Sequence, residues 1–132
     1  MEEIEKTKFR NYTPHELNMI DGETKEQLVS FPPSGLIIRA DKITTVDRKI
    51  TIEGHEFEIR KVLFGEPILV KSREDTEGIP LPNPQEGVIL LVSALAGAAL
   101  KEAGRTDFWI MDDTKYDGRT ILGATGFSDM TL

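Results

Sequence analysis

Among the side chains of this sequence, those of arginine are best suited to bind an anion. The guanidinium group makes bidentate contacts to phosphate, and its planar fork is fixed in shape. Four candidates lie on or beside expected strands or after an expected helix: Arg39, Arg60, Arg105 and Arg119. For any single one of them, an exposed strand residue that balances an abundant carboxylate is the competing explanation.

The segment 88–104, VILLVSALAGAALKEAG, offers a second kind of anion donor. Its first five residues predict a buried strand, after which Ser93 is placed as an N-cap and Gly104 as a helix end. The first N–H groups of a helix have no partner within it and attract negative charge. Ser93 and Ala94 are therefore candidate ligand donors. Two alternatives stay open: one helix over 88–103, and a helix whose small residues serve only close packing or subunit contact.

The sequence does not predict catalysis. The absence of cysteine excludes thiolate chemistry, disulfides and Cys-based zinc sites, and a serine elbow and a glycine-rich phosphate loop are both missing. The acidic residues Asp112, Asp113 and Asp117 could hold a divalent cation, but a solvated turn is expected there. We expect no active site, no resident metal and no cofactor.

Charge and composition limit the partners. A net charge of −7 argues against binding to polymeric nucleic acid, which depends on a basic surface. The apolar run 88–100 is shorter than the roughly 20 residues that cross a bilayer, so no membrane contact is expected. The charged start MEEIEKTKFRNY lacks the apolar stretch of a secretory signal. A cytoplasmic location is expected.

One domain is expected over residues 1–132, because a chain of this length buries a core without disulfides. Residues 1–8 are expected to fray. Two short strands are expected around a turn at 13–15, with one helical turn at 13–16 as the alternative. Further strands are expected on either side of a tight reversal at 32–35 and in a hairpin that turns at Gly54, with one wet face.

The second half of the chain predicts a β-α-β segment. Residues 71–87 form a long proline-rich loop that could serve as a binding surface or a spacer. The strand and helix of 88–103 follow, then a strand at 106–111, a turn at 112–119 and a last strand at 120–127. The expected fold class is α+β, a single compact domain of mostly antiparallel β-sheet with a C-terminal β-α-β segment.

Five short motifs occur in a particular order along the chain. They are NYTPH at 11–15, PSG at 33–35, PNPQEGVI at 82–89, VSAL at 92–95 and DGRTILG at 117–123. This order resembles the first-described Thoeris anti-defence family of phage proteins, and the likeness covers residues 11–123. Residues 101–117 depart from the family pattern.

The resemblance implies a non-enzymatic sponge. Such a protein sequesters, without cleaving it, a cyclic ADP-ribose isomer (glycocyclic ADP-ribose) made by a bacterial TIR enzyme in the host cytoplasm. It further implies a homo-oligomer, a dimer or hexamer, with pockets shared between subunits, and in some members a separate site for cyclic oligonucleotides. An alternative is a phage accessory or virion protein whose small-residue helix and 71–87 loop form a protein interface. A nucleotide-cleaving enzyme that uses the three aspartates is a third hypothesis.

The resemblance carries over to few single residues. It implies backbone donation at Ser93 and Ala94 and a phosphate clamp at Arg119. Asn11 lies in a matched motif, where it either fixes a turn or contacts the ligand, and the same holds for His15. Four further candidates rest on their chemistry alone, and the aromatic one among them would stack on a base: Arg39, Arg60, Arg105 and Phe108.

Overall fold

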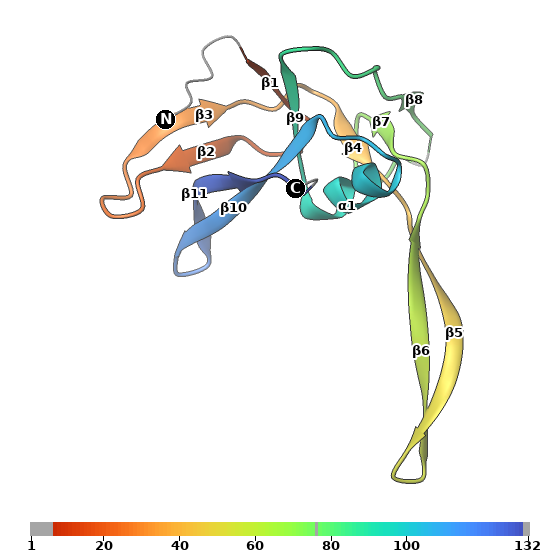
Figure 1. The fold of residues 1–132 in the computed structure, drawn as a ribbon. Coiled ribbons are helices and arrows are strands. Elements are labelled where there is room, and N and C mark those ends of the chain that lie inside the picture. Colours follow the sequence, from red (N-terminus) through yellow and green to blue (C-terminus); the bar gives the residue numbers. More distant parts are fainter. Residues whose placement is uncertain (1–6, 76, 131–132) are drawn as a thin grey trace.

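A curled six-stranded sheet forms the centre of the protein (Figure 1). The computed structural model describes residues 7–75 and 77–130. The strands lie in the order β1-β9-β10-β11-β2-β3, and the pairs β1–β9, β9–β10 and β11–β2 are parallel. Their bounds are β1 Lys8–Asn11, β2 Leu17–Ile20, β3 Gln27–Phe31, β9 Val88–Val92, β10 Phe108–Asp117 and β11 Thr120–Ser128.

The two edge strands of this sheet approach each other. Asn11 at the end of β1 forms a parallel bridge with Pro33, and the backbone N–H of Ser34 donates to the Asn11 carbonyl at 2.9 Å. The rings of Phe9 and Phe31 lie 5.3 Å apart between the same two strands. Trp109 and Phe127, from β10 and β11, complete an aromatic cluster with these rings. The sheet therefore curls around this cluster.

Helix α1, Ala94–Glu102, packs against β10 with its small residues. A Cβ atom added to Gly97 would lie 2.9 Å from the Met130 sulfur and 3.0 Å from a methyl group of Ile110. The core at this interface includes the fully buried residues Leu100 and Phe108. A larger residue at position 97 would thus push the helix away from the sheet.

A second, three-stranded sheet closes the other side of this core. It contains β4 Ile37–Arg39, β7 Ile68–Val70 and the short β8 Ile79–Pro80, in the order β4-β7-β8. Ile38 and Leu69 are its main contributions to the core. The proline-containing strand β8 lies at the edge, where a missing N–H group is tolerated.

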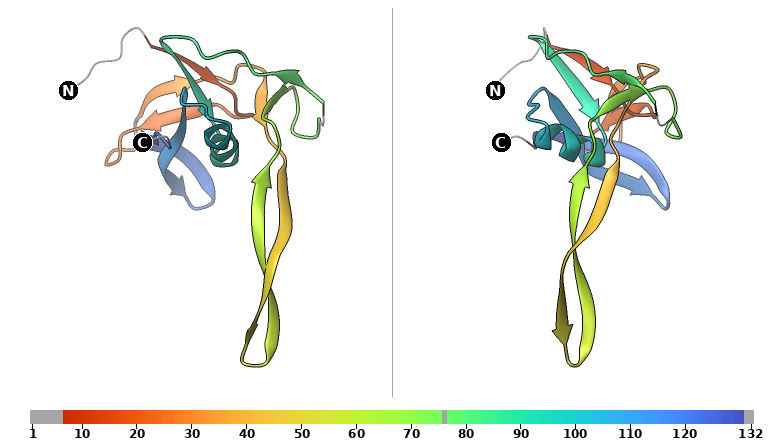
Figure 2. Two further views of the ribbon diagram at one scale, coloured as in Figure 1. Left: turned by 45° about the vertical axis from the view of Figure 1, so that its right-hand side comes forward. Right: turned by 90° about the vertical axis from the view of Figure 1, so that its right-hand side faces the viewer.

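A long hairpin leaves the rest of the protein (Figures 1 and 2). Its strands are β5 Lys42–Ile52 and β6 His55–Phe64, and we call residues 42–64 the arm. Glu53 and Gly54 connect them with φ angles of 49° and 80°, as a two-residue hairpin turn requires. No residue of the arm is buried.

Most expectations for the elements are confirmed. The protein is mostly strand with one short helix and a β9-α1-β10 segment, as the expected fold class states. Strand 88–92 precedes a helix capped by Ser93, and Gly104 follows it with a φ of 83°, which excludes the alternative of one continuous helix. Residues 13–16 form a bend and no helical turn. Of the expected frayed tail, residues 1–6 lie outside the described residues, and β1 begins at Lys8.

Two expectations are wrong. Residues 112–117 were expected in a turn, but they continue β10, and only Gly118 and Arg119 turn. Pairing with β11 satisfies the backbone there and outweighs the turn-forming composition. The strands on either side of residues 32–35 do not pair with each other, because β3 joins the large sheet and β4 the small one.

The longest described helix has nine residues, whereas crossing a bilayer takes roughly 20. No helix in the described part of the chain is therefore a candidate membrane span.

Candidate functional site

Two adjacent pockets share Tyr12 as a lining residue. The first, which we call the helix-start pocket, has a volume of about 310 Å³ and opens at the beginning of α1. The second, the proline-loop pocket, has a volume of about 230 Å³. The helix-start pocket is lined by Tyr12, Thr13, Pro14, Ile37, Ile38, Arg39, Ala40, Arg73, Ser93, Leu95 and Ala96.

The start of α1, where Ser93, Leu95 and Ala96 line the helix-start pocket, leaves two backbone N–H groups without a partner among the described residues. The Ser93 side chain accepts from the Ala96 N–H at 3.2 Å, and the Ser93 carbonyl accepts from the Gly97 N–H at 2.8 Å. The N–H groups of Ala94 and Leu95 have no acceptor among the described residues. The first turn of the helix contains no acidic residue. Its partial positive charge is therefore not neutralised locally.

Two arginines supply charge to the helix-start pocket. The side chain of Arg39 is 27% exposed; one of its nitrogens lies 2.9 Å from an Asp41 carboxylate oxygen, and another donates to the Asp75 carbonyl. Arg73 contacts the His15 ring at 3.2 Å and has no carboxylate partner among the described residues. Arg39 is thus ion-paired and held in place, whereas Arg73 forms no ion pair within the described residues and interacts with the charge of neighbouring Glu74.

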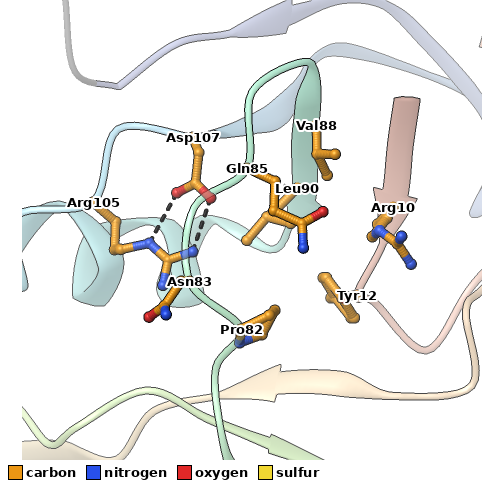
Figure 3. A pocket seen from close by; sticks show the side chains of 9 residues that line it. All are labelled: Arg10, Tyr12, Pro82, Asn83, Gln85, Val88, Leu90, Arg105 and Asp107. Atoms are coloured by element: carbon orange, nitrogen blue, oxygen red, sulfur yellow. Dashed lines mark hydrogen bonds and ion pairs between the residues drawn. The ribbon is translucent and has the colours of Figure 1, made fainter. Parts of the chain in front are cut away.

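The proline-loop pocket has a different balance of charge (Figure 3). The guanidinium group of Arg105 makes two hydrogen bonds to the Asp107 carboxylate, at 2.9 and 2.8 Å. Arg10 lines the same pocket, as do the amide side chains of Asn83 and Gln85. Because Arg105 forms an ion pair with Asp107, the net positive charge in this pocket comes from Arg10.

Asn11 has a structural position between β1 and β3. Its amide group donates to the carbonyls of His15 at 2.7 Å and Phe31 at 2.9 Å. Its carbonyl oxygen accepts from the N–H and the hydroxyl of Thr13, at 2.9 and 2.7 Å. Every polar atom of this buried side chain is used, and the residue lines neither pocket. Of the two roles considered for Asn11, these contacts support turn fixing.

The remaining candidates lie apart from the helix-start pocket. Phe108 is 0% exposed and belongs to the core, so its ring has no open face for stacking. Arg60 lies on the arm and pairs with Glu58 at 3.2 Å. Arg119 lies in the exposed turn between β10 and β11. The structure thus brings together Arg39, Ser93 and the adjacent Ala94, and places Arg105 on the far side of Tyr12.

Arg73, like Arg10 in the proline-loop pocket, is a charged pocket residue that the sequence did not single out. It lies in the charged front half of the 71–87 loop, away from any strand, and only the fold brings that loop to α1. The backbone of residues 72–75 makes a tight turn in which the Ser72 N–H donates to the Asp75 carboxylate at 3.1 Å. The Ser72 hydroxyl donates to Glu74, which lowers the pKa of that carboxyl group.

The aspartates considered for a divalent cation are dispersed or engaged. Asp113 accepts from the Thr125 hydroxyl at 2.6 Å and lies 3.1 Å from the Lys115 ammonium group. The hydrogen bond from Thr125 lowers the pKa of the Asp113 carboxyl group most, and Lys115 lowers it further. Within residues 7–75 and 77–130, no three His, Asp or Glu side chains are placed to share a metal ion.

Comparison with known proteins gives no match to any family model, curated protein or solved structure.

Proposed function

We propose that the protein binds a small phosphate-bearing signal nucleotide of the cyclic ADP-ribose type and sequesters it without cleaving it. The observation that carries this proposal is the convergence of sequence motifs. The NYTPH motif contributes Tyr12, Thr13 and Pro14 to the helix-start pocket, and the VSAL motif contributes Ser93 and Leu95. The PNPQEG segment lines the adjacent proline-loop pocket.

The chemistry of the helix-start pocket suits a phosphate group. Oxygens of a phosphate would accept from the N–H groups of Ala94 and Leu95, while Arg73 and Arg39 balance its charge. The pocket volume of about 310 Å³ is at the lower end of the range for small-molecule sites, about 300–1,000 Å³. In this proposal the pocket holds one nucleotide portion of the signal, with the apolar residues Ile37 and Leu95 beside it.

The resemblance to the Thoeris anti-defence family supports the ligand class and the biological setting. In this proposal the protein acts in the cytoplasm of an infected bacterium and removes a signal made by a TIR enzyme. It needs neither a cofactor nor a metal for that purpose, because tight reversible binding alone lowers the free concentration of the signal.

The location of the site is tested by calorimetric titration of purified protein with cyclic ADP-ribose isomers. Arg73→Gln should weaken binding about 10- to 100-fold, because a hydrogen bond to a charged group contributes about 1.5–3 kcal/mol. Arg119→Gln removes the same charge outside the pocket and serves as the matched control. Weaker binding by Arg73→Gln together with unchanged binding by Arg119→Gln would support the helix-start pocket as the binding site. Loss of binding only in Arg119→Gln would contradict that location.

A further inference from the structure

The arm has one apolar face that nothing in the described chain covers. Paired residues of the two strands place their side chains on the same side of a hairpin. The register gives this face the pairs Ile43–Leu63, Thr45–Lys61, Arg48–Ile59, Ile50–Phe57 and Ile52–His55. Phe57 is 50% exposed and Ile52 is 53% exposed. Six of the ten side chains on this face are large and apolar.

An isolated two-stranded hairpin of this kind is marginally stable in water. The arm projects away from the rest of the chain (Figures 1 and 2). A monomer would therefore leave the apolar face in solvent. Contiguous apolar surface on a soluble chain marks an interaction site. A partner that covers this face would stabilise both the arm and the complex.

The charges on the arm identify the kind of partner. On the opposite face, Lys49 pairs with Glu56 and Arg60 pairs with Glu58, each at 3.2 Å. On the apolar face, Arg48 and Lys61 form no ion pair within the described residues, and the paired positions there include no acid. The apolar face is therefore cationic and needs an anionic partner.

The rest of the same chain has the complementary charge. The arm contains five Lys and Arg residues and four Asp and Glu residues, a net charge of +1, whereas the whole chain carries −7, which leaves −8 outside the arm. That remainder also exposes large apolar side chains, among them Leu28, Tyr116 and Ile121. Two arms packed face to face would instead bring like charges together.

We infer that the apolar face of the arm docks on the body of a second copy of this chain, the body being the residues outside 42–64. Oppositely charged surfaces speed association and fix the register of the two partners. The contact therefore weakens as salt concentration rises. This inference concerns assembly and stands independently of the proposed nucleotide binding.

Light scattering and sedimentation of the full chain test the assembly. The expected molar mass is a multiple of 14.8 kDa, with an association constant that falls as salt is added. Arg48→Gln with Lys61→Gln should weaken association about tenfold or more. Lys49→Gln with Arg60→Gln, which removes the same charge from the opposite face, should leave it within threefold of wild type, on the order of 0.6 kcal/mol. A monomer at every soluble concentration, or an equal loss in both double variants, would overturn the inference.

The docking surface is tested by replacing Phe57 with photoreactive benzoylphenylalanine in a mixture of ¹⁴N- and ¹⁵N-labelled protein. Cross-linked peptides that combine the two labels report contacts between copies. The inference predicts mixed-label links from position 57 to peptides outside 42–64. Links only to the arm of the other copy, or no mixed-label links at all, would overturn docking on the body.

Discussion

Replacement of Asn11 by alanine should destabilise the whole fold, because this side chain ties β1 to the end of β3. The variant leaves the buried Thr13 N–H without an acceptor, which costs about 1–3 kcal/mol. It also removes the hydrogen bonds to Phe31 and from the Thr13 hydroxyl, at about 0.5–1.5 kcal/mol each. The His15 carbonyl keeps the Thr13 hydroxyl as a donor. The expected loss of unfolding free energy is about 2–6 kcal/mol.

Urea denaturation followed by tryptophan fluorescence measures this loss, because Trp109 lies in the aromatic cluster beside Phe9. With a slope of about 1–3 kcal/mol per molar urea, the midpoint should fall by on the order of 1–3 M. Asn83→Ala is the matched control, since Asn83 is exposed and has no hydrogen bond within the described residues. A loss below about 1 kcal/mol in Asn11→Ala would refute the structural role assigned to Asn11.

Three further predictions concern the fold. Gly123→Ala should lower the free energy of unfolding by about 1–3 kcal/mol, because its Cβ would lie 2.5 Å from the Asn18 carbonyl oxygen. Gly126→Ala, on the same strand, places its Cβ in open space and should leave the melting temperature unchanged. Ser93→Ala should cost about 1 kcal/mol by removing the cap of α1 and Ser93→Gly only a few tenths, which urea melts can distinguish. Hydrogen bonds from the backbone N–H groups of Thr24 and, to a smaller extent, Glu23 lower the pKa of the Asp21 carboxyl group. The stability that this carboxylate contributes is present above its unfolded pKa and is lost as pH falls through the lower folded pKa. The unfolding free energies of wild type and Asp21→Asn should therefore differ at neutral pH and converge in acid.

Local sequence signals predicted the elements whose residues decide their own conformation. The aliphatic run 88–92, the Ser93 cap and Gly104 specify a strand and helix without reference to the rest of the chain. The same is true of the arm, whose Glu-Gly turn and alternating residues produce a hairpin. What the alternation could not predict is that no residue of the arm is buried by the rest of the described chain.

Long-range contacts decided the features that the sequence did not predict. The composition of residues 112–117 favours a turn, but their pairing with β11 holds them as a strand. Asn11 fits either a turn or a ligand site until Phe31, from another strand, is known to accept its hydrogen bond. Arg73 carries no local signal of a binding role, and only the fold of its loop brings it to α1. The sequence identifies Phe108 only as an aromatic residue of a strand, and its burial follows from the packing of the core that it shares with α1.

Depletion of a signal nucleotide from solution tests the proposed sequestration most directly. An excess of purified protein is incubated with a panel of cyclic ADP-ribose isomers and cyclic oligonucleotides, and free ligand is measured by chromatography before and after the protein is denatured by heat. The proposal predicts that at least one cyclic ADP-ribose isomer disappears and returns chemically unchanged. Ligands that never disappear, or a ligand that returns as a linear product, would contradict it.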